Sequence, residues 1–227
     1  MKLFTEIFDF FLPRFCSSCN KKLTVKERIV CPECLCKIQT ASKNRLQFEF
    51  QKKFLQKNII AGFTSLFIFE KDKELQSIIH SIKYNQRFLT GKFLGELVGK
   101  EFNKLFQSWE IDYIIPIPLH HLKKAERGFN QSFFIAKGIN KQTKILINSK
   151  VIKRNRFTQT QTALNLHERE ENMSGAFSIK KVNDLKDKNI LLVDDVITTG
   201  ATISECAKVL KDNGAKNVFA VSVAIAD

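Results

Sequence analysis

The stretch with the most chemistry in it is NILLVDDVITTGATISECAKVL, residues 189–210. Apolar residues lead into two adjacent carboxylates, Asp194 and Asp195. A turn rich in threonine and glycine follows, and then a helical pattern begins. Carboxylates accept hydrogen bonds, and the vicinal hydroxyls of a ribose are suitable donors. The aspartates therefore predict a site for the hydroxyl groups of a sugar.

The turn after the aspartates predicts an anion site. Gly200 lets the backbone approach a ligand closely, and the first amides of the next helix have no partners within that helix. Together with the helix dipole these amides favour a phosphate, and Thr198, Thr199 and Thr202 add hydroxyl donors. The two carboxylates would repel the phosphate, so they must face another part of the ligand. The whole stretch describes a ribose 5-phosphate site, whereas the alternative is a strand–turn–helix whose aspartates only cap.

A cysteine cluster near the other end of the chain predicts a metal site. Cys16, Cys19, Cys31 and Cys34 follow the pattern C-x2-C-x11-C-x2-C, which is close to the spacing of structural zinc sites. Four protein ligands leave no open position for water, so the zinc would be structural. Cys36 is a further candidate for the place of Cys34. A disulfide framework is the alternative, but no secretory signal pattern supports an oxidising destination.

Alternating strand and helix patterns must position these groups. Apolar runs at 62–70, 111–118, 144–153, 176–180, 189–193 and 217–227 are typical of strands, and amphipathic helical patterns lie between most of them. Such alternation predicts an α/β fold with a mostly parallel sheet flanked by helices. Ligands of such sheets bind beyond the carboxyl ends of the strands, and residues 194–202 follow such an end.

The predicted organisation has three parts. Residues 1–40 form an N-terminal helix and a zinc ribbon, because apolar residues recur at helical spacing ahead of the cysteines. Residues 41–58 are polar and basic, and we expect a linker there. Residues 59–227 form the main domain. The N-terminal helix would dock on the protein body or, as the alternative, on a membrane surface. No segment approaches the roughly 20 apolar residues that span a bilayer, so we expect a cytoplasmic protein.

The segment ILLVDDVITTGAT resembles the signature with which type I phosphoribosyltransferases bind phosphoribosyl diphosphate (PRPP). The resemblance implies that Asp194 and Asp195 bind the ribose hydroxyls. It also implies a 5-phosphate loop made of Val196, Ile197, Thr198, Thr199, Gly200, Ala201 and Thr202. Magnesium is expected to accompany PRPP.

The wider chain resembles the ComF family of competence-related proteins. The resemblance rests on the cysteine ribbon, IKYNQRF, DYIIPIPLHHLKKAERGFNQS and RNRFTQTQTALNLHEREENMSGAF. It implies a phosphoribosyltransferase-like protein that acts in DNA uptake during natural transformation, with an unidentified acceptor if it is an enzyme. It allows single-stranded DNA and DNA-uptake proteins as partners. The alternative is a non-catalytic protein on the same fold that binds single-stranded DNA or senses PRPP.

Two basic segments are candidates for the rest of the PRPP site. In related enzymes the loop after a strand holds the diphosphate, and here that loop offers Pro118, Lys123, Lys124 and Arg127. A polar stretch at 154–175 stands where those enzymes have a closing lid, and it offers Arg154, Arg156 and Arg169. Lys83 and Tyr84 are expected to line the same cleft. The formal net charge of +14 suits phosphorylated ligands and polyanions, although solvated lysine faces would account for it as well.

Overall fold

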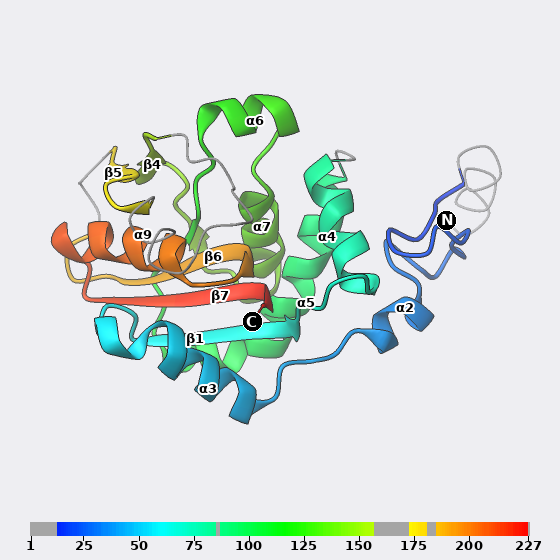
Figure 1. Cartoon of the computed structure of the whole chain (residues 1–227), viewed down its shortest axis with the longest axis horizontal. Coiled ribbons are helices and arrows are strands. Elements are labelled where there is room, and N and C mark those ends of the chain that lie inside the picture. Colours follow the sequence, from blue (N-terminus) through cyan, green and yellow to red (C-terminus); the bar gives the residue numbers. More distant parts are fainter. Residues whose placement is uncertain (1–12, 85–86, 157–172, 181–184, 227) are drawn as a thin grey trace.

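A five-stranded parallel sheet carries the main part of the protein (Figure 1). The computed structural model describes residues 13–84, 87–156, 173–180 and 185–226. The strands are β1 (Gly62–Ile68), β2 (Tyr113–Pro116), β3 (Leu146–Ile147), β4 (Ile152–Arg154), β5 (Phe177–Ile179), β6 (Asn189–Ile197) and β7 (Asn217–Ile225). The helices are α2 (Pro32–Lys37), α3 (Lys43–Lys53), the 3₁₀ turn η1 (Leu55–Lys57), α4 (Glu74–Tyr84), α5 (Phe88–Ser108), α6 (His121–Arg127), α7 (Gln131–Thr143) and α9 (Ala201–Asp212).

The sheet order is β1-β7-β6-β2-β3, and every neighbouring pair is parallel. Because the strands are parallel, their carboxyl ends meet at one edge of the sheet. In the register of β2 and β6, Pro116 lies beside Val193, so the chain leaves β2 next to the aspartates of β6. The α/β fold with a mostly parallel sheet is therefore confirmed, and the central strands bring two distant segments to one edge.

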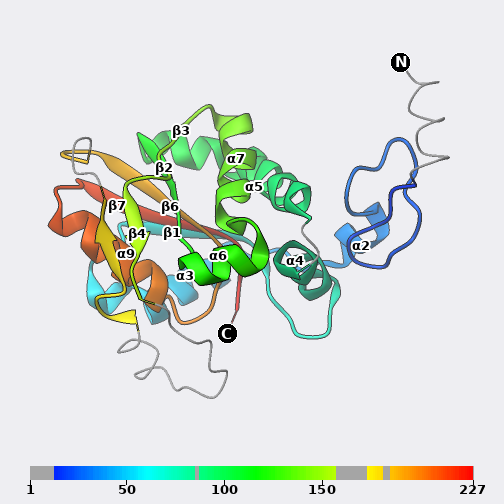
Figure 2. The same cartoon turned by 90° about the horizontal axis from the view of Figure 1, so that it is seen from above.

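Helices cover both faces of the sheet, as Figure 2 shows for α7 and α9 on opposite sides. Alternate residues of β6 enter two separate cores, because successive side chains of a strand point to opposite faces. Leu191 packs in the core that contains α4, α5 and α7, and Leu192 packs in the core that contains α9. In the first core the backbones of α5 and α7 approach so closely that a side chain at Gly95 would collide with the carbonyl oxygen of Ile135. Both helices are thereby fixed against the sheet.

The expected linker at 41–58 contains regular structure instead. Helix α3 and the turn η1 occupy most of it, and Ser42 begins α3 by accepting a hydrogen bond from the Arg45 amide at 3.3 Å. Leu46, Phe50 and Phe54, spaced four residues apart, pack on the core beneath α9. This apolar stripe is narrow among many charged residues, which is why the segment resembles a linker in the sequence.

The predicted strand at 144–153 was wrong in its extent. Residues 146–147 form β3 at the edge of the main sheet, and 152–154 form β4, which pairs with β5 in a separate antiparallel ribbon. Residues 148–151 between them belong to neither strand. The expected N-terminal helix and most of the polar stretch at 154–175 lie outside the described residues. Within the described ranges, no helix has the length and apolarity to cross a bilayer.

Candidate functional site

The two aspartates lie at the end of β6, which continues through Ile197 and so includes both of them. Asp195 is buried, with 8% of its side chain exposed. Its Oδ2 forms an ion pair with Lys83 Nζ of α4 at 3.0 Å and accepts a hydrogen bond from Gln131 Nε2 of α7 at 3.5 Å. Its Oδ1 accepts the Val196 amide at 2.8 Å. The charge of Asp195 raises the pKa of Lys83, so this ammonium stays protonated beside the carboxylate.

Asp194 also faces the first turn of α7. Its Oδ1 accepts hydrogen bonds from Ser132 Oγ and from the Asp195 amide, each at 2.9 Å. Burial of the carboxyl group and the neighbouring charge of Asp195 raise the pKa of Asp194 to about 7. At neutral pH this carboxyl group therefore changes its protonation readily, and a ligand that donates hydrogen bonds to it favours the carboxylate form.

The raised pKa of Asp194 predicts a pH-dependent stability. The folded protein keeps a proton between about pH 4 and pH 7 that the unfolded chain releases, so the free energy of unfolding falls as the pH rises through that window. The loss approaches about 1.4 kcal/mol for each pH unit crossed. Urea denaturation at pH 5 and pH 8 measures this fall in the free energy of unfolding, and the Asp194→Asn variant should not show it. The exposed Asp212→Asn variant should keep the wild-type profile, and identical profiles for all three proteins would contradict the prediction.

The start of α7 holds the acidic pair in place. Asn130 caps this helix: its Oδ1 accepts the Ser132 amide at 3.0 Å, and its Nδ2 donates to the Ile117 carbonyl at 2.9 Å. The second bond ties the helix start to the segment after β2. Gln131 and Ser132 can then reach the two aspartates, and the positive end of the helix dipole stabilises them. This explains the RGFNQS segment, whose role at the aspartates the sequence alone did not indicate.

The turn after β6 has the geometry of an anion site. Gly200 adopts φ +79° and begins α9. Among the described residues, the amides of Thr198, Thr199 and Gly200 form no backbone hydrogen bond. Phe54 packs directly against Gly200, and Lys53 beside it donates to the Ala226 carbonyl at 3.1 Å. The segment that resembled a linker thus forms the support beneath this turn.

Gly200→Ala is expected to destabilise the protein by about 2–4 kcal/mol, since a left-handed alanine is strained and its Cβ also meets a packed ring. That Cβ would lie 2.7 Å from Phe54 Cε1. Gly128→Ala is a matched control, because Gly128 adopts φ +78° with no atom within 4 Å of the added Cβ. It should cost only about 1–2 kcal/mol. Urea denaturation measures both, and equal losses would show that Phe54 does not constrain the turn.

Cationic side chains gather beside the acidic pair. Arg127 lies close enough to Lys83 to oppose its charge, and Lys123 is affected by Lys83, Arg127 and Arg154 together. Burial, followed by these neighbouring charges, lowers the pKa of Lys123. Burial lowers the pKa of Arg154, and the nearby charge of Asp194 opposes this shift. An anion bound among these groups would relieve their mutual repulsion.

The remaining predicted residues differ in their positions. Residues 121–127, which were expected to form a loop, form helix α6. Of the four residues predicted for the diphosphate loop, only Pro118 lies in the connection between β2 and α6. Lys124 is exposed, and Arg156 is exposed and donates to the Ser174 carbonyl at 3.0 Å. Arg169 lies outside the described residues. The structure thus places Arg154 within the influence of Asp194 and Lys123 beside Arg154, Arg127 and Lys83, while it leaves Lys124 and Arg156 at the surface.

The four predicted cysteine ligands form one cluster. The Sγ atoms of Cys16, Cys19, Cys31 and Cys34 all lie within 4.8 Å of one another, with 3.8 Å between those of Cys19 and Cys31. A zinc tetrahedron with Zn–S bonds of about 2.3 Å has edges of about 3.8 Å. The amides of Ser18 and Cys31 donate to Cys16 Sγ at 3.4 and 3.3 Å, which favours its thiolate. The cluster can hold a metal ion, and Cys36 is not part of it.

Comparison with known proteins identifies relatives of most of the chain and a domain family that matches its second half. The phosphoribosyl transferase domain family matches residues 125–226. Competence protein F of Haemophilus influenzae is 28% identical over 207 residues, 89% of this chain and 86% of that protein. DNA utilization protein YhgH of Shigella flexneri is 31% identical over 147 residues, 63% of this chain and 64% of that protein. Among solved structures, a purine phosphoribosyltransferase from Pyrococcus horikoshii is 18% identical and covers 59% of this chain and 74% of its own, with a TM-score of 0.40.

Proposed function

Since this chain is a ComF-type protein with a phosphoribosyl transferase domain, we propose that it binds PRPP with magnesium and acts in DNA uptake as a phosphoribosyltransferase-type protein. One observation carries the proposal. An acidic pair, a turn whose amides form no backbone hydrogen bond within the described part of the chain, and a group of cations lie together at the carboxyl edge of the sheet.

Each part of PRPP has a complementary group. Asp194 and Asp195 accept hydrogen bonds from the ribose hydroxyls. Residues 196–202 bind the 5-phosphate, chiefly through the amides of the turn that precedes α9. Lys123, Arg127 and Arg154 face the diphosphate, and Lys83 balances the charge of Asp195. Three cations remain as auxiliary candidates. Lys124 and Arg156 are exposed, and Arg169 lies outside the described residues.

The proposed chemistry is transfer of the phosphoribosyl group. The bond between ribose C1 and the diphosphate oxygen breaks, the sugar gains oxocarbenium character, and a nitrogen nucleophile attacks C1. Magnesium would neutralise charge on the diphosphate. The protein's own residues hold the ribose through its hydroxyls and place cations beside the leaving group, and they do this mainly by positioning.

We also propose that the four cysteines hold a structural zinc ion. Supporting observations are the sulfur distances, the amide-to-sulfur bonds and the absence of a fifth ligand in the group that the described residues form. With four sulfur ligands the ion has no position for a substrate, so its role is to fold the ribbon.

The test of the proposed function is a calorimetric titration of Mg·PRPP into the zinc-loaded full chain, followed by an assay for diphosphate release with a broad set of nitrogen acceptors. Binding together with turnover supports the enzyme. Binding without turnover supports a PRPP-dependent regulatory role. A chain that holds zinc and stays folded but does not bind Mg·PRPP would refute the proposal.

Direct binding of single-stranded DNA is the second candidate function, and the exposed lysines of the ribbon favour it. Lys22 and Lys26 are exposed on the segment between the two cysteine pairs. DNA binding through them should weaken steeply with salt and should fall after zinc chelation. Charge reversal of Lys22 and Lys26 should reduce the affinity for single-stranded DNA more than charge reversal of Lys123 and Lys124. Binding that neither change affects would exclude the ribbon as the DNA contact.

A further inference from the structure

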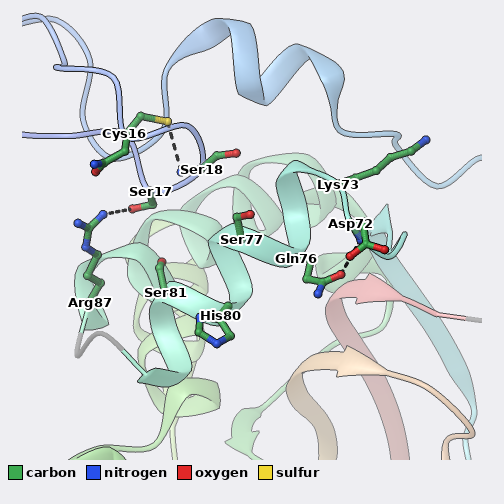
Figure 3. A pocket seen from close by; sticks show the side chains of 11 residues that line it. Cys16, Ser17, Ser18, Asp72, Lys73, Gln76, Ser77, His80, Ser81 and Arg87 are labelled. Carbon is green, nitrogen blue, oxygen red and sulfur yellow. Dashed lines mark hydrogen bonds between the residues drawn. The ribbon is translucent and has the colours of Figure 1, made fainter.

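A polar cavity lies between the first cysteine pair and helix α4 (Figure 3). Its volume is about 500 Å³. Ser17 and Ser18 line it from the ribbon, Ser77 and His80 line it from α4, and Arg87 lines it from the start of α5. Asp72 and Lys73 line it from the segment before α4. The walls therefore offer hydroxyl groups, an imidazole and two cations against one carboxylate, which suits a polar ligand that carries a negative charge.

The ribbon wall of this cavity is held on the protein body by direct bonds. Ser17 Oγ lies 3.3 Å from Thr90 Oγ1 of α5, and Ser18 Oγ donates to the Glu74 carbonyl of α4 at 3.5 Å. Arg28 of the ribbon forms an ion pair with Glu96 of α5 at 2.7 Å. The ribbon thus has a defined position over α4, and the cavity is a feature of the fold.

Helix α4 connects the cavity with the aspartates of β6. His80 lines the cavity, and its ring lies 4.5 Å from that of Tyr84, one turn further along the helix. Tyr84 follows Lys83, whose ammonium binds Asp195. The guanidinium of Arg127, one of the cations beside the aspartates, lies 5.8 Å from the Tyr84 ring centre. One face of α4 therefore leads from the ribbon to the edge of the proposed ribose site.

Tyr84 retains free surface although it touches two partners. Its side chain is 56% exposed, next to a charged pair at which a sugar would bind. An exposed aromatic ring in such a place can stack with an aromatic heterocycle. Stacking on Tyr84 would place a heterocycle beside the proposed ribose, and a negatively charged group on the same molecule could reach the hydroxyls and Arg87 of the cavity.

We propose that the ribbon and α4 together form the acceptor site. The acceptor is of the nucleotide class, with its heterocycle on Tyr84 and its phosphate in the cavity near Arg87. This inference rests on the proposed function, because it names the class of molecule that would attack the ribose of PRPP. A nitrogen of the heterocycle would form the new bond to ribose C1 as the bond from C1 to diphosphate breaks; diphosphate departs, and the nitrogen releases its proton to solvent. It also gives the ribbon a direct part in the site, since Ser17 and Ser18 belong to the first cysteine knuckle.

The test measures binding of the four nucleoside 5′-monophosphates AMP, GMP, CMP and UMP to the zinc-loaded full chain, by calorimetry with and without saturating Mg·PRPP. Tyr84→Ala removes the ring, and Ser77→Trp fills the cavity from an exposed helix position. Each should weaken binding of the preferred nucleotide about tenfold or more, as expected for loss of one stacking partner or of the space. Tyr84→Phe keeps the ring and should restore binding. Gln107→Trp, at an exposed position of α5 away from the cavity, controls for the bulk of tryptophan.

The outcomes separate this inference from the function on which it rests. Wild-type protein that binds Mg·PRPP but none of the four nucleotides overturns the inference and leaves the proposed function intact. Nucleotide affinities that are equal in wild type, Tyr84→Ala and Ser77→Trp also overturn it. Protein that binds a nucleotide through Tyr84 but does not bind Mg·PRPP refutes the proposed function while it confirms the nucleotide site.

Discussion

The double variant Asp194→Asn/Asp195→Asn is expected to bind Mg·PRPP at least about 100-fold more weakly than the wild type. Hydrogen bonds to charged groups contribute about 1.5–3 kcal/mol each, and both carboxylates lose their charge at once. Isothermal titration calorimetry measures the loss. Because Lys83, Lys123, Arg127 and Arg154 remain, the site gains net positive charge, so a loss of affinity for an anionic ligand cannot come from general electrostatics.

Inorganic diphosphate makes this test specific for the sugar. It lacks the ribose and depends only on the cations, so the double variant should bind Mg·diphosphate as tightly as the wild type or more tightly. Asp112→Asn is the matched control for PRPP. Asp112 accepts bonds from Lys188 Nζ at 3.1 Å and the Asn189 amide at 2.8 Å, at the opposite end of β6. Parallel losses for PRPP and diphosphate would contradict the assignment of the aspartates to the ribose.

Loss of the metal is expected to unfold the ribbon. Binding of a structural zinc ion contributes about 10–16 kcal/mol to the folding of small zinc domains, so the effect should exceed that of any single core substitution. Ribbon residues Leu23, Val30 and Ile38 belong to the same core as α4 and α5. Unfolding of the ribbon therefore exposes apolar surface of the body as well, and the whole protein should become less stable.

Cys34→Ser and Cys36→Ser form a matched pair for this prediction. Cys34 is buried in the cluster, whereas Cys36 is exposed and outside it, although both lie on α2. Cys34→Ser should lose stoichiometric zinc and the hydrogen-exchange protection of residues 13–40, while Cys36→Ser should keep both. Zinc retained by Cys34→Ser but lost by Cys36→Ser would reverse the ligand assignment.

The ion network beneath the turn at residues 198–200 shows what α3 adds to the site. Glu49 is fully buried and forms ion pairs with Arg45 at 2.8 Å and Lys53 at 2.9 Å. Burial lowers the pKa of Lys53 even though Glu49 opposes this shift. Lys53 in turn bonds the end of β7 and lies against Gly200. The pair fixes α3 beneath the turn, so a segment far from the aspartates in sequence determines how the turn is supported.

The sequence by itself determined the features that a short run of residues specifies. Residues 189–210 contain the strand, the two carboxylates, Gly200 and the helix start in order, and local geometry alone places them together. The cysteine spacing likewise identified the four cysteines that form the cluster, because each C-x-x-C turn directs two sulfurs to one point. The alternating strand and helix patterns are also local, because each pattern reflects which face of that one element is buried. Their alternation along the chain predicted the parallel sheet.

The partners of the aspartates depend on tertiary structure. Lys83, Gln131 and Ser132 reach them from α4 and α7, and the crossovers of a parallel sheet separate these helices widely in sequence. The sequence analysis expected Lys83 in the same cleft, but a single sequence carries no signal for the individual pairings apart from a cap residue such as Asn130. Only packing could show that residues 43–57 support the turn at Gly200. The position of the ribbon over α4 was likewise decided by tertiary contacts, because the bonds of Ser17, Ser18 and Arg28 join it to helices that lie more than fifty residues away in the chain.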